Sequence, residues 1–587
     1  MIMNNTNPNT PIENLAIGKI IEVDGTHIIA ELDVKITELS RVYGGDTYPI
    51  GQFGSIIKIH FGRRLIYAYV GRLRMKAEFE RERGIATAAS PDERVIEADL
   101  FGEAEWIQDT QLTPPQWKLE FERGVSTFPL PQQMVYLTPK SELRDIYGQG
   151  KGATILLGVH VGSGETPCFA EMNELLGKHT AILGSTGAGK SGTVAAVLHS
   201  LLERGALERY EKWHPRIVIL DPHNEYGTAF PNADRLSTDE NSLELPYWLL
   251  DLQETGALFI GKTEHAATSQ TNVVKNALIK ARENGAAQLS IPPGRITVDS
   301  PVPYVLGDPT GLDEFGKKGG VPYGDGFIGE INQQRPNNQN RKDHEEFNKV
   351  IRKIETLLRD TTMNFLMKAW DNKSDPFGEV VSQLFGKGNP VRIVDLSGIR
   401  NDVAGIASAV IARTLFNYKL WQSQEEREAD PVVLVCEEAH RYVPDKGEAQ
   451  YEAAQEAIRR IAKEGRKYGL GLLLVSQRPS EVESTVLSQC NSWIVHRITN
   501  ETDRKHVQSI LPDSLAGLTK VLSGLRRQEA VFVGQAAVLP SRILIRTLDE
   551  NQRPSSHDID FDKGWQTDPL LDEQLKKIAE RWRLQQR

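Results

Sequence analysis

The segment GSTGAGKS, residues 184–191, constrains what this chain can fold into more than any other stretch. It fits the pattern G-x-x-x-x-G-K-[ST], whose glycines let backbone N–H groups turn inward around the β- and γ-phosphates of a nucleotide. The apolar run HTAILG before it predicts a buried strand. After it, apolar residues recur at helical spacing, at Val194, Val197, Leu198, Leu201 and Leu202. A helix that begins at such a loop points its N-terminus at the anion, so the segment predicts a phosphate-binding site.

The positions of this loop have separate expected roles. Lys190 supplies a positive charge for the β- and γ-phosphate oxygens, and the Ser191 hydroxyl is suited to Mg²⁺. We therefore expect a P-loop NTPase with ATP and Mg²⁺ as cofactors. The residues expected to bind the nucleotide are Gly184, Ser185, Thr186, Gly187, Ala188, Gly189, Lys190, Ser191, Gly192 and Thr193.

Composition sets the broad class of the protein. Of the 587 residues, 39% are hydrophobic and 25% are charged, which is the balance of a soluble globular protein with about three or four domains. No apolar run approaches the roughly 18 residues that a membrane span needs, and the first residues lack the apolar core of a signal peptide. Cys168, Cys436 and Cys490 lie far apart, without metal-ligand spacing. We expect a cytoplasmic protein with reduced thiols, no membrane partner and no zinc site.

The net charge of −10 does not suggest a surface coated with basic residues. If DNA binds, we expect it at a local basic ring or channel, with an acidic outer surface that reduces non-specific binding.

The pattern of apolar residues divides the chain into five segments. Alternating strands near the N-terminus, with a hairpin signal at Asp24-Gly25, predict a small β-barrel. Farther along, apolar strands that alternate with helical segments predict a parallel sheet. The expected segments are a β-barrel region at 1–150 with a charged insertion, partly helix or loop, at about 76–110; the first part of an ATPase core at 151–235; a helical insertion at 236–385, with a loop rich in Gly, Pro, Asn and Gln at roughly 291–343; the second part of the core at 386–550; and a tail with an amphipathic helix at 551–587.

Acidic residues that follow the strand VVLVC complete the predicted nucleotide site. We assign Glu437 to Mg²⁺, through water, and Glu438 to positioning or polarising the attacking water. The alternative is a pair of glutamates that merely begins an exposed helix. DPHNEY follows another apolar strand, so Asp221 and Glu225 either face the same crevice or form hydrogen bonds within their own loop.

Polar and basic residues after the acidic pair suggest how hydrolysis is sensed. Gln477 ends the strand LGLLLVS and is expected to touch the γ-phosphate; a simple strand cap is the alternative. Arg466 is expected to stabilise transition-state charge, or else to be one of many surface arginines. Arg441 and Lys446 are candidate contacts to the DNA backbone, against the alternative of a solvated charged loop. For His440 the alternatives are a relay of the nucleotide state to that loop and a hydrogen-bonded structural role, of which we expect the structural one.

These residues together resemble the HerA family, within the larger group of HerA and FtsK DNA translocases. The resemblance spans nearly the whole chain and is carried by the barrel region and by VGSGETP, KHTAILGSTGAGKS, DPHNEY, LPYWLL, EEAH, EGRKYGLGLLLVSQRPS and SHDIDF. It implies an α/β fold: a RecA-like P-loop NTPase core with an N-terminal small β-barrel and a helical insertion. It also implies a homohexameric ring with double-stranded DNA in its central pore and nucleotide at the subunit interfaces. Arg466 matches the family's second catalytic arginine.

The resemblance is weaker at the position of the family's other basic residue, which acts in trans. Where the family has a basic finger just before the P-loop strand, this sequence has Lys178 and His179. Lysine lacks the planar fork of arginine. These two residues are therefore the candidate trans contact.

The residues predict hydrolysis that is coupled between neighbouring subunits, and the resemblance implies that an ATPase of this kind moves along or opens duplex DNA. The resemblance also implies a partner protein. This partner is either a nuclease in DNA processing, or a nuclease or NAD-degrading effector in phage defence. A second hypothesis is a hexameric scaffold that activates such an effector and uses ATP to control assembly. A third, a conjugation or secretion ATPase, is disfavoured because no membrane segment is predicted.

Overall fold

The computed structural model describes residues 8–36, 38–52, 54–84, 92–109, 116–148, 152–161, 166–261, 267–319, 321–322, 324–386, 388–445, 452–511, 521–555 and 560–584. The chain divides into two compact units. The first unit comprises residues 1–211, 477–480 and 490–549, and the second comprises residues 212–476, 481–489 and 550–587. In the described residues, no helix is long and apolar enough to cross a membrane.

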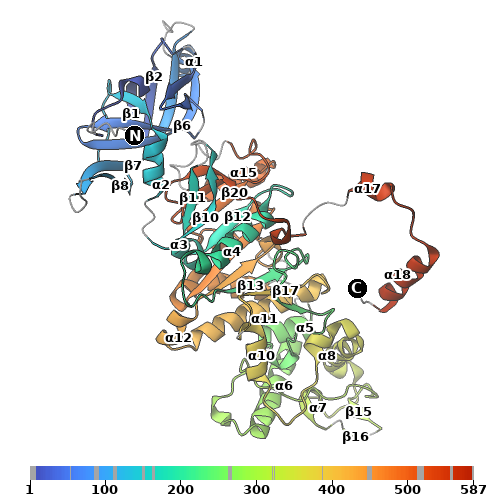
Figure 1. The fold of residues 1–587 in the computed structure, drawn as a ribbon. Helices are drawn as coiled ribbons and strands as arrows, with labels where there is room; N and C mark the ends of the chain where they lie inside the picture. Colours follow the sequence, from blue (N-terminus) through green and yellow to red (C-terminus); the bar gives the residue numbers. More distant parts are fainter. Residues whose placement is uncertain are drawn as a thin grey trace. The chain divides into compact units, whose positions relative to one another are not determined.

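In the described part of the first unit, six strands close into a barrel (Figure 1). Their order is β2-β1-β9-β5-β6-β7, and β7 pairs back with β2 to close the sheet. The expected hairpin is confirmed, since Asp24 pairs with His27 and Gly25 has a φ of +57°. The barrel strands are β1 (Ala16–Asp24), β2 (His27–Leu32), β5 (Ile56–Phe61), β6 (Arg64–Met75), β7 (Arg94–Asp109) and β9 (Met134–Leu137); β8 (Gln116–Arg123) extends the sheet from β7, and β3 (Ser40–Tyr43) and β4 (Asp46–Pro49) form a separate hairpin.

The expectation of helix or loop at 76–110 is right only for its first part. Helix α1 (Lys76–Glu82) lies there, but residues 94–109 form the long strand β7. The charge of this segment favoured helix or loop, yet Ile96, Ala98 and Leu100 are buried in the barrel core on one face of the strand. Val95 is buried on the other face, in a small cluster with Ile29 and Phe79.

The rest of the first unit contains strands of a mixed sheet, in the order β11-β10-β22-β21-β20-β12. β12 and β20 are parallel, and the other neighbouring pairs in this order are antiparallel. Leu539 packs with barrel residues, and Arg123 of β8 donates hydrogen bonds to the carbonyl oxygens of Val538 (2.8 Å) and Gly534 (2.9 Å). The elements are α2 (Lys140–Tyr147), β10 (Thr154–His160), β11 (Pro167–Glu171), α3 (Met172–Gly177), β12 (Thr180–Leu183), α4 (Lys190–Leu207), β20 (Ser492–His496), α15 (Glu501–Ile510), β21 (Glu529–Gly534) and β22 (Ser541–Ile545).

The second unit is built on parallel strands in the order β19-β18-β13-β17-β14. Their near-continuous apolar sequences are buried, which is typical of a parallel sheet covered on both faces. Helices α11 and α13 pack together beside it. The elements are β13 (Arg216–Asp221), β14 (Asp234–Ser237), β17 (Val391–Asp395), α11 (Asn401–Leu420), α12 (Gln424–Ala429), β18 (Val432–Cys436), α13 (Glu452–Glu464), β19 (Leu470–Ser476) and α14 (Ser484–Leu487).

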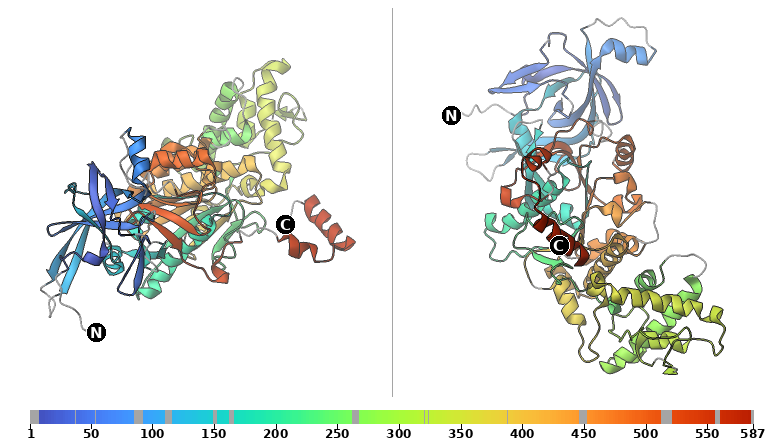
Figure 2. Two further views of the ribbon diagram at one scale, coloured as in Figure 1. Left: turned by 90° about the horizontal axis from the view of Figure 1, so that it is seen from above. Right: turned by 90° about the vertical axis from the view of Figure 1, so that its right-hand side faces the viewer.

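Helices dominate the chain between β14 and β17, in the green and yellow part of Figure 2. α6 packs against α7 and α8, and α8 buries one apolar face while its charged residues point away. The segment 291–343, expected as a loop, includes the helix α7 and the short pair β15 and β16. The elements are α5 (Leu252–Phe259), α6 (Ala267–Gln288), β15 (Lys317–Lys318), β16 (Val321–Pro322), α7 (Gly326–Gln333), α8 (Arg341–Arg359), α9 (Asn364–Met367) and α10 (Phe377–Phe385).

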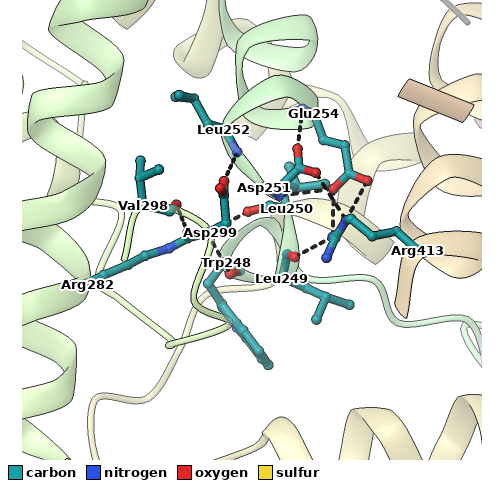
Figure 3. Close-up of polar contacts among 10 residues, drawn as sticks. All are labelled: Trp248, Leu249, Leu250, Asp251, Leu252, Glu254, Arg282, Val298, Asp299 and Arg413. Carbon is teal, nitrogen blue, oxygen red and sulfur yellow. Dashed lines mark hydrogen bonds and ion pairs between the residues drawn. The ribbon is translucent and has the colours of Figure 1, made fainter. Parts of the chain in front are cut away.

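Two arginines fix the segment that leads into these helices (Figure 3). Arg282 of α6 is fully buried and donates to backbone carbonyl oxygens within residues 248–250 and at Val298. Arg413 of α11 forms an ion pair with Glu254 (2.7 Å) and lies 3.3 Å from Asp251. Asp251 and Glu254 form a capping box at the start of α5. The arginines thus join α6 and α11 to the same turn of chain.

The predicted amphipathic helix of the tail is present as α18 (Asp572–Leu584), after α17 (Phe561–Trp565). The side chains of Leu571, Leu575, Ile578 and Trp582 are exposed in the described structure.

Candidate functional site

The phosphate-binding loop has the predicted strand and helix on either side of it. β12 is buried along its whole length and ends at Leu183, and α4 begins at Lys190. Between them, Gly184, Gly187 and Gly189 have φ angles of +157°, +72° and +112°. Residues with a Cβ adopt such angles only at a cost, so the loop needs glycine at these places.

The surroundings of the loop leave no room for a side chain at Gly184 and little room at Gly189. A Cβ on Gly184 would lie 2.6 Å from the Cβ of His496, and a Cβ on Gly189 would lie 3.3 Å from the backbone nitrogen of Gln528. A loop of backbone N–H groups at a helix N-terminus is suited to the phosphates of a nucleotide. The residues present therefore fit ATP.

His496 packs against this loop at Gly184. It is fully buried, its Nε2 lies 2.8 Å from the hydroxyl of Thr193, and its Nδ1 lies 2.9 Å from the carbonyl oxygen of Glu529. Burial lowers the pKa of His496 to about 4, so the ring is neutral near pH 7. A neutral imidazole serves as donor on one nitrogen and acceptor on the other, which suits a hydroxyl on one side and a carbonyl on the other.

Lys190 and Gln477 both lie at the loop. Lys190 is buried, and its Nζ donates a hydrogen bond to the carbonyl oxygen of Ser185 at 3.3 Å. The Thr186 hydroxyl donates to Oε1 of Gln477. The sequence placed Gln477 at the end of a strand, and its side chain does reach the P-loop. Its sensing role stays a prediction.

The acidic pair follows β18 in the second unit. Glu437 and Glu438 are 3% and 8% exposed, so they do not begin an exposed helix as the alternative reading required. The backbone N–H of Glu437 donates to the carbonyl oxygen of Leu220 on the neighbouring strand β13, at 3.3 Å. Buried carboxylates at the carboxyl end of a parallel strand are suited to Mg²⁺ and water.

Each of these carboxylates contacts another side chain. The phenol of Tyr226 donates to Oε2 of Glu437 at 3.0 Å. Burial raises the pKa of Tyr226 well above its usual range, and the charge of Glu437 raises it further, so the phenol keeps its proton. Nδ1 of His440 lies 3.3 Å from Oε2 of Glu438 and 3.3 Å from the hydroxyl of Ser476. His440 therefore has the hydrogen-bonded place that was expected.

Glu438 also has an unusual backbone. Its φ of +52° and ψ of +49° are left-handed, a region that non-glycine residues enter at a cost of about 1–3 kcal/mol. Such strain is concentrated at functional sites, because the surrounding structure must hold it in place. The conformation agrees with a catalytic assignment for Glu438, which stays a prediction.

Asp221 takes the second of its two expected roles. Its carboxylate accepts hydrogen bonds from the backbone N–H groups of His223 (3.2 Å) and Tyr226 (3.0 Å), within its own loop. Burial raises the pKa of Asp221, and the backbone hydrogen bonds lower it by a smaller amount. The carboxylate therefore shapes the loop that carries Tyr226.

The basic candidates have different surroundings. Arg466 is exposed in a short 3₁₀ helix after α13, which agrees with both of its expected roles; its catalytic role stays a prediction. Nη2 of Arg441 donates to Oδ1 of Asn401 at 2.6 Å, beside a cavity of about 220 Å³ that His223 also lines. Lys446 lies outside the described residues.

The candidate trans contact is engaged within the first unit. Nζ of Lys178 lies 2.6 Å from Glu174 and 2.9 Å from Oε1 of Gln535. His179 is 3% exposed and has a φ of +59°. A contact with a neighbouring subunit would require Lys178 to leave these partners, and that role stays a prediction.

Sequence reasoning missed the roles of Tyr226 and His496. Tyr226 lies in the quoted motif DPHNEY, but its hydroxyl was not connected to Glu437. His496 ends the apolar strand that pairs in parallel with β12. A polar residue where a buried strand ends is the signal that pointed to Gln477, and it could have pointed to His496 as well.

Comparison with known proteins shows which family the central part of this chain resembles. Residues 155–415, which include the P-loop and β13, match the model of the central domain of the helicase HerA. The central part of the chain therefore resembles the central domain of the HerA helicases. The chain is a P-loop ATPase similar to that family, in agreement with the expectation from its motifs.

The relatives of this chain are distant. A probable helicase of Methanocaldococcus jannaschii is 23% identical over 450 residues, which are 76% of this chain and 77% of the relative. A DNA double-strand break repair helicase HerA of Sulfurisphaera tokodaii is 27% identical over 461 residues, again 76% and 77% of the two chains. Among solved structures, VirB4 of Thermoanaerobacter pseudethanolicus is 16% identical, with a TM-score of 0.42 and coverage of 68% of this chain and 99% of that one.

Proposed function

We propose that this chain is an ATP-hydrolysing ring motor that translocates on or unwinds double-stranded DNA. The observation that carries the proposal is the buried acidic pair after β18, with Glu438 in a strained backbone conformation, in a chain that has a complete P-loop and resembles the HerA helicases. Relatives that are named as DNA repair helicases support duplex DNA as the substrate.

The chain's residues divide the work of hydrolysis between them. Backbone N–H groups of residues 184–189 and the charge of Lys190 hold the β- and γ-phosphates. Ser191 and Glu437, the latter through water, hold Mg²⁺, which when bound neutralises charge on the phosphate oxygens. Glu438 polarises the attacking water, and His440 orients its carboxylate from 3.3 Å. Gln477 reports the γ-phosphate to the loop through Thr186.

Coupling between neighbours would make the motor act as a ring. We propose a homohexamer in which Arg466 stabilises the transition-state charge of a neighbouring active site, with Lys178 and His179 as a further trans contact. DNA threads the central pore, where Arg441 and Lys446 contact backbone phosphates. With a net charge of −10, binding depends on such local basic residues.

We further propose that the ring works in the cytoplasm with a partner, either a nuclease in DNA processing or a nuclease or NAD-degrading effector in phage defence. The motor would bring DNA to the partner or control its activity. If the ring only scaffolds and activates the effector, it has little translocation of its own.

ATP turnover by the purified full chain, with and without duplex DNA at fixed salt, tests this function. Oligomer mass is recorded on the same sample, and Lys190→Ala, which loses the phosphate-binding charge, is the blank. The motor predicts a hexamer whose turnover rises severalfold with duplex DNA and falls to background in Lys190→Ala. A hexamer whose turnover is indifferent to DNA supports the scaffold instead, and retained turnover in Lys190→Ala refutes the site.

A further inference from the structure

The loop after β13 is built around a single carboxylate. Asp221 is fully buried at the end of the strand and accepts the backbone N–H groups of His223 and Tyr226. Asn224, between them, has a left-handed φ of +55°, and its Oδ1 accepts a hydrogen bond from Arg235 at 2.8 Å. The chain is thereby turned so that Tyr226 points back toward the sheet.

Parallel pairing brings this loop beside the acidic pair. Leu220 of β13 is paired with Cys436 of β18, so the next residues on the two strands, Asp221 and Glu437, leave the sheet at the same edge. The two buried side chains Tyr226 and Glu437 then meet, with 3.0 Å between the phenol oxygen and Oε2. The contact joins residues 211 positions apart in the sequence.

We infer that Tyr226 is a positioning residue for the metal-binding carboxylate: its phenol holds Glu437 in the orientation that receives hydrated Mg²⁺. This inference rests on the proposed role of Glu437. A donor that fixes one oxygen of a carboxylate limits rotation of the group, and such donors tune metal sites from outside the ligand set. Asp221 acts one step farther away, because it holds the backbone that presents Tyr226.

A purely structural tyrosine explains the geometry less well. The ring of Tyr226 stacks near Phe230, with 6.5 Å between ring centroids, and a phenylalanine would fill the same space. The hydroxyl adds a polar group to a buried site, where it costs free energy unless it is bonded. Its acceptor is the carboxylate of Glu437, after β18. For a tyrosine with only a structural role, a backbone carbonyl would be an equally good acceptor.

The second unit offers a matched control for the loss of one buried hydroxyl. Tyr247 is 1% exposed and its phenol donates to the carbonyl oxygen of Tyr304 at 2.7 Å. Tyr226→Phe and Tyr247→Phe remove the same atom from equally buried hydrogen bonds. They differ in the acceptor, which is a carboxylate in one case and a backbone carbonyl in the other.

The test compares Tyr226→Phe, Tyr247→Phe, Glu437→Gln and the wild-type full chain. A fluorescent, slowly hydrolysed ATP analogue is titrated in EDTA and at a series of Mg²⁺ concentrations, and ATP turnover is measured over the same series. For Tyr226→Phe we expect unchanged binding in EDTA and an increase of about 10-fold or more in the half-saturating Mg²⁺ concentration, with turnover recovering at high Mg²⁺. Tyr247→Phe should keep the wild-type Mg²⁺ dependence. Thermal unfolding shows that each variant is folded.

The outcomes separate this inference from the proposed function. If Glu437→Gln loses Mg²⁺-dependent binding while Tyr226→Phe behaves like Tyr247→Phe, the positioning role of Tyr226 is overturned and the proposed function stands. If Glu437→Gln keeps the wild-type Mg²⁺ dependence, the metal assignment itself fails. An equal weakening of nucleotide binding in EDTA and in Mg²⁺ for Tyr226→Phe would also overturn the inference, because it would indicate a general distortion of the site.

Discussion

Replacing Gly184 by alanine should damage the phosphate-binding loop specifically. The added Cβ would lie 2.6 Å from the Cβ of His496 and 3.3 Å from its Cα. His496 cannot easily move, since its two ring nitrogens lie 2.8 Å from Thr193 and 2.9 Å from the carbonyl oxygen of Glu529. The loop must therefore shift instead.

The size of the effect follows from two costs. Overpacking of this kind costs about 1–3 kcal/mol, and a non-glycine residue in a glycine-only φ region costs about 1–3 kcal/mol. If about 2 kcal/mol of this cost destabilises the conformation of the loop that binds nucleotide, the affinity for Mg²⁺·ATP drops about 30-fold. Moving the loop relieves the clash, so we expect a larger loss in nucleotide binding than in the stability of the free protein.

Nucleotide titration and thermal unfolding with and without Mg²⁺·ATP measure both quantities. A ligand at 100 times its dissociation constant stabilises the wild-type fold by about 2.7 kcal/mol, and Gly184→Ala should lose most of this gain at the same concentration. Gly378→Ala is the control, since a Cβ there meets nothing within 4 Å and the residue lies in α10. A Gly184→Ala variant that binds Mg²⁺·ATP within threefold of wild type would refute the steric argument.

Three further predictions concern other parts of the chain. Arg413→Ala leaves the buried carboxylate of Glu254 without its ion pair and should lower the free energy of unfolding by about 3–5 kcal/mol in urea titrations, whereas a cost below about 1 kcal/mol would contradict the importance of the pair. Arg466→Ala should slow ATP turnover far more than it weakens nucleotide binding, and a loss confined to affinity would count against its catalytic role. Burial lowers the pKa of His160 to about 3 and that of His496 to about 4, below the usual value near 6.5, so the unfolded chain takes up protons first as the pH falls. The stability that these residues contribute is present above pH 6.5, and each histidine should lower the free energy of unfolding by about 2 kcal/mol between pH 7.5 and pH 5.0. Replacing His496 by Gln should remove its share of this pH dependence. A His496→Gln variant with the same pH dependence as the wild type would contradict this assignment.

Local patterns in the sequence predicted much of the fold. The hairpin at Asp24-Gly25, the strand before Gly184 and the helix after Lys190 follow from alternation, turn chemistry and helical spacing, each of which acts over a few residues. Strand β7 was missed in part because the segment was judged by its charge. The alternation of apolar Ile96, Ala98 and Leu100 with Glu97 and Asp99 was the better signal.

The site was harder to predict because its contacts join distant parts of the chain. Glu437 and Gln477 were found because each follows a buried strand. The bond from Tyr226 to Glu437 depends on β13 and β18 being neighbours in the sheet, and chain order does not determine strand order. The left-handed backbone of Glu438 arises from the packing around it, since glutamate has no local preference for that conformation.

Displacement of a third strand from triplex DNA tests the central claim most directly, because a motor that moves along the duplex removes the strand and a static ring does not. The purified chain is mixed with a duplex that carries a labelled triplex-forming strand, ATP and Mg²⁺, with Lys190→Ala as the control. The account predicts ATP-dependent release of the labelled strand by the wild type and none by Lys190→Ala. Release that does not need ATP, or steady ATP hydrolysis in the presence of duplex DNA without any release, would contradict it.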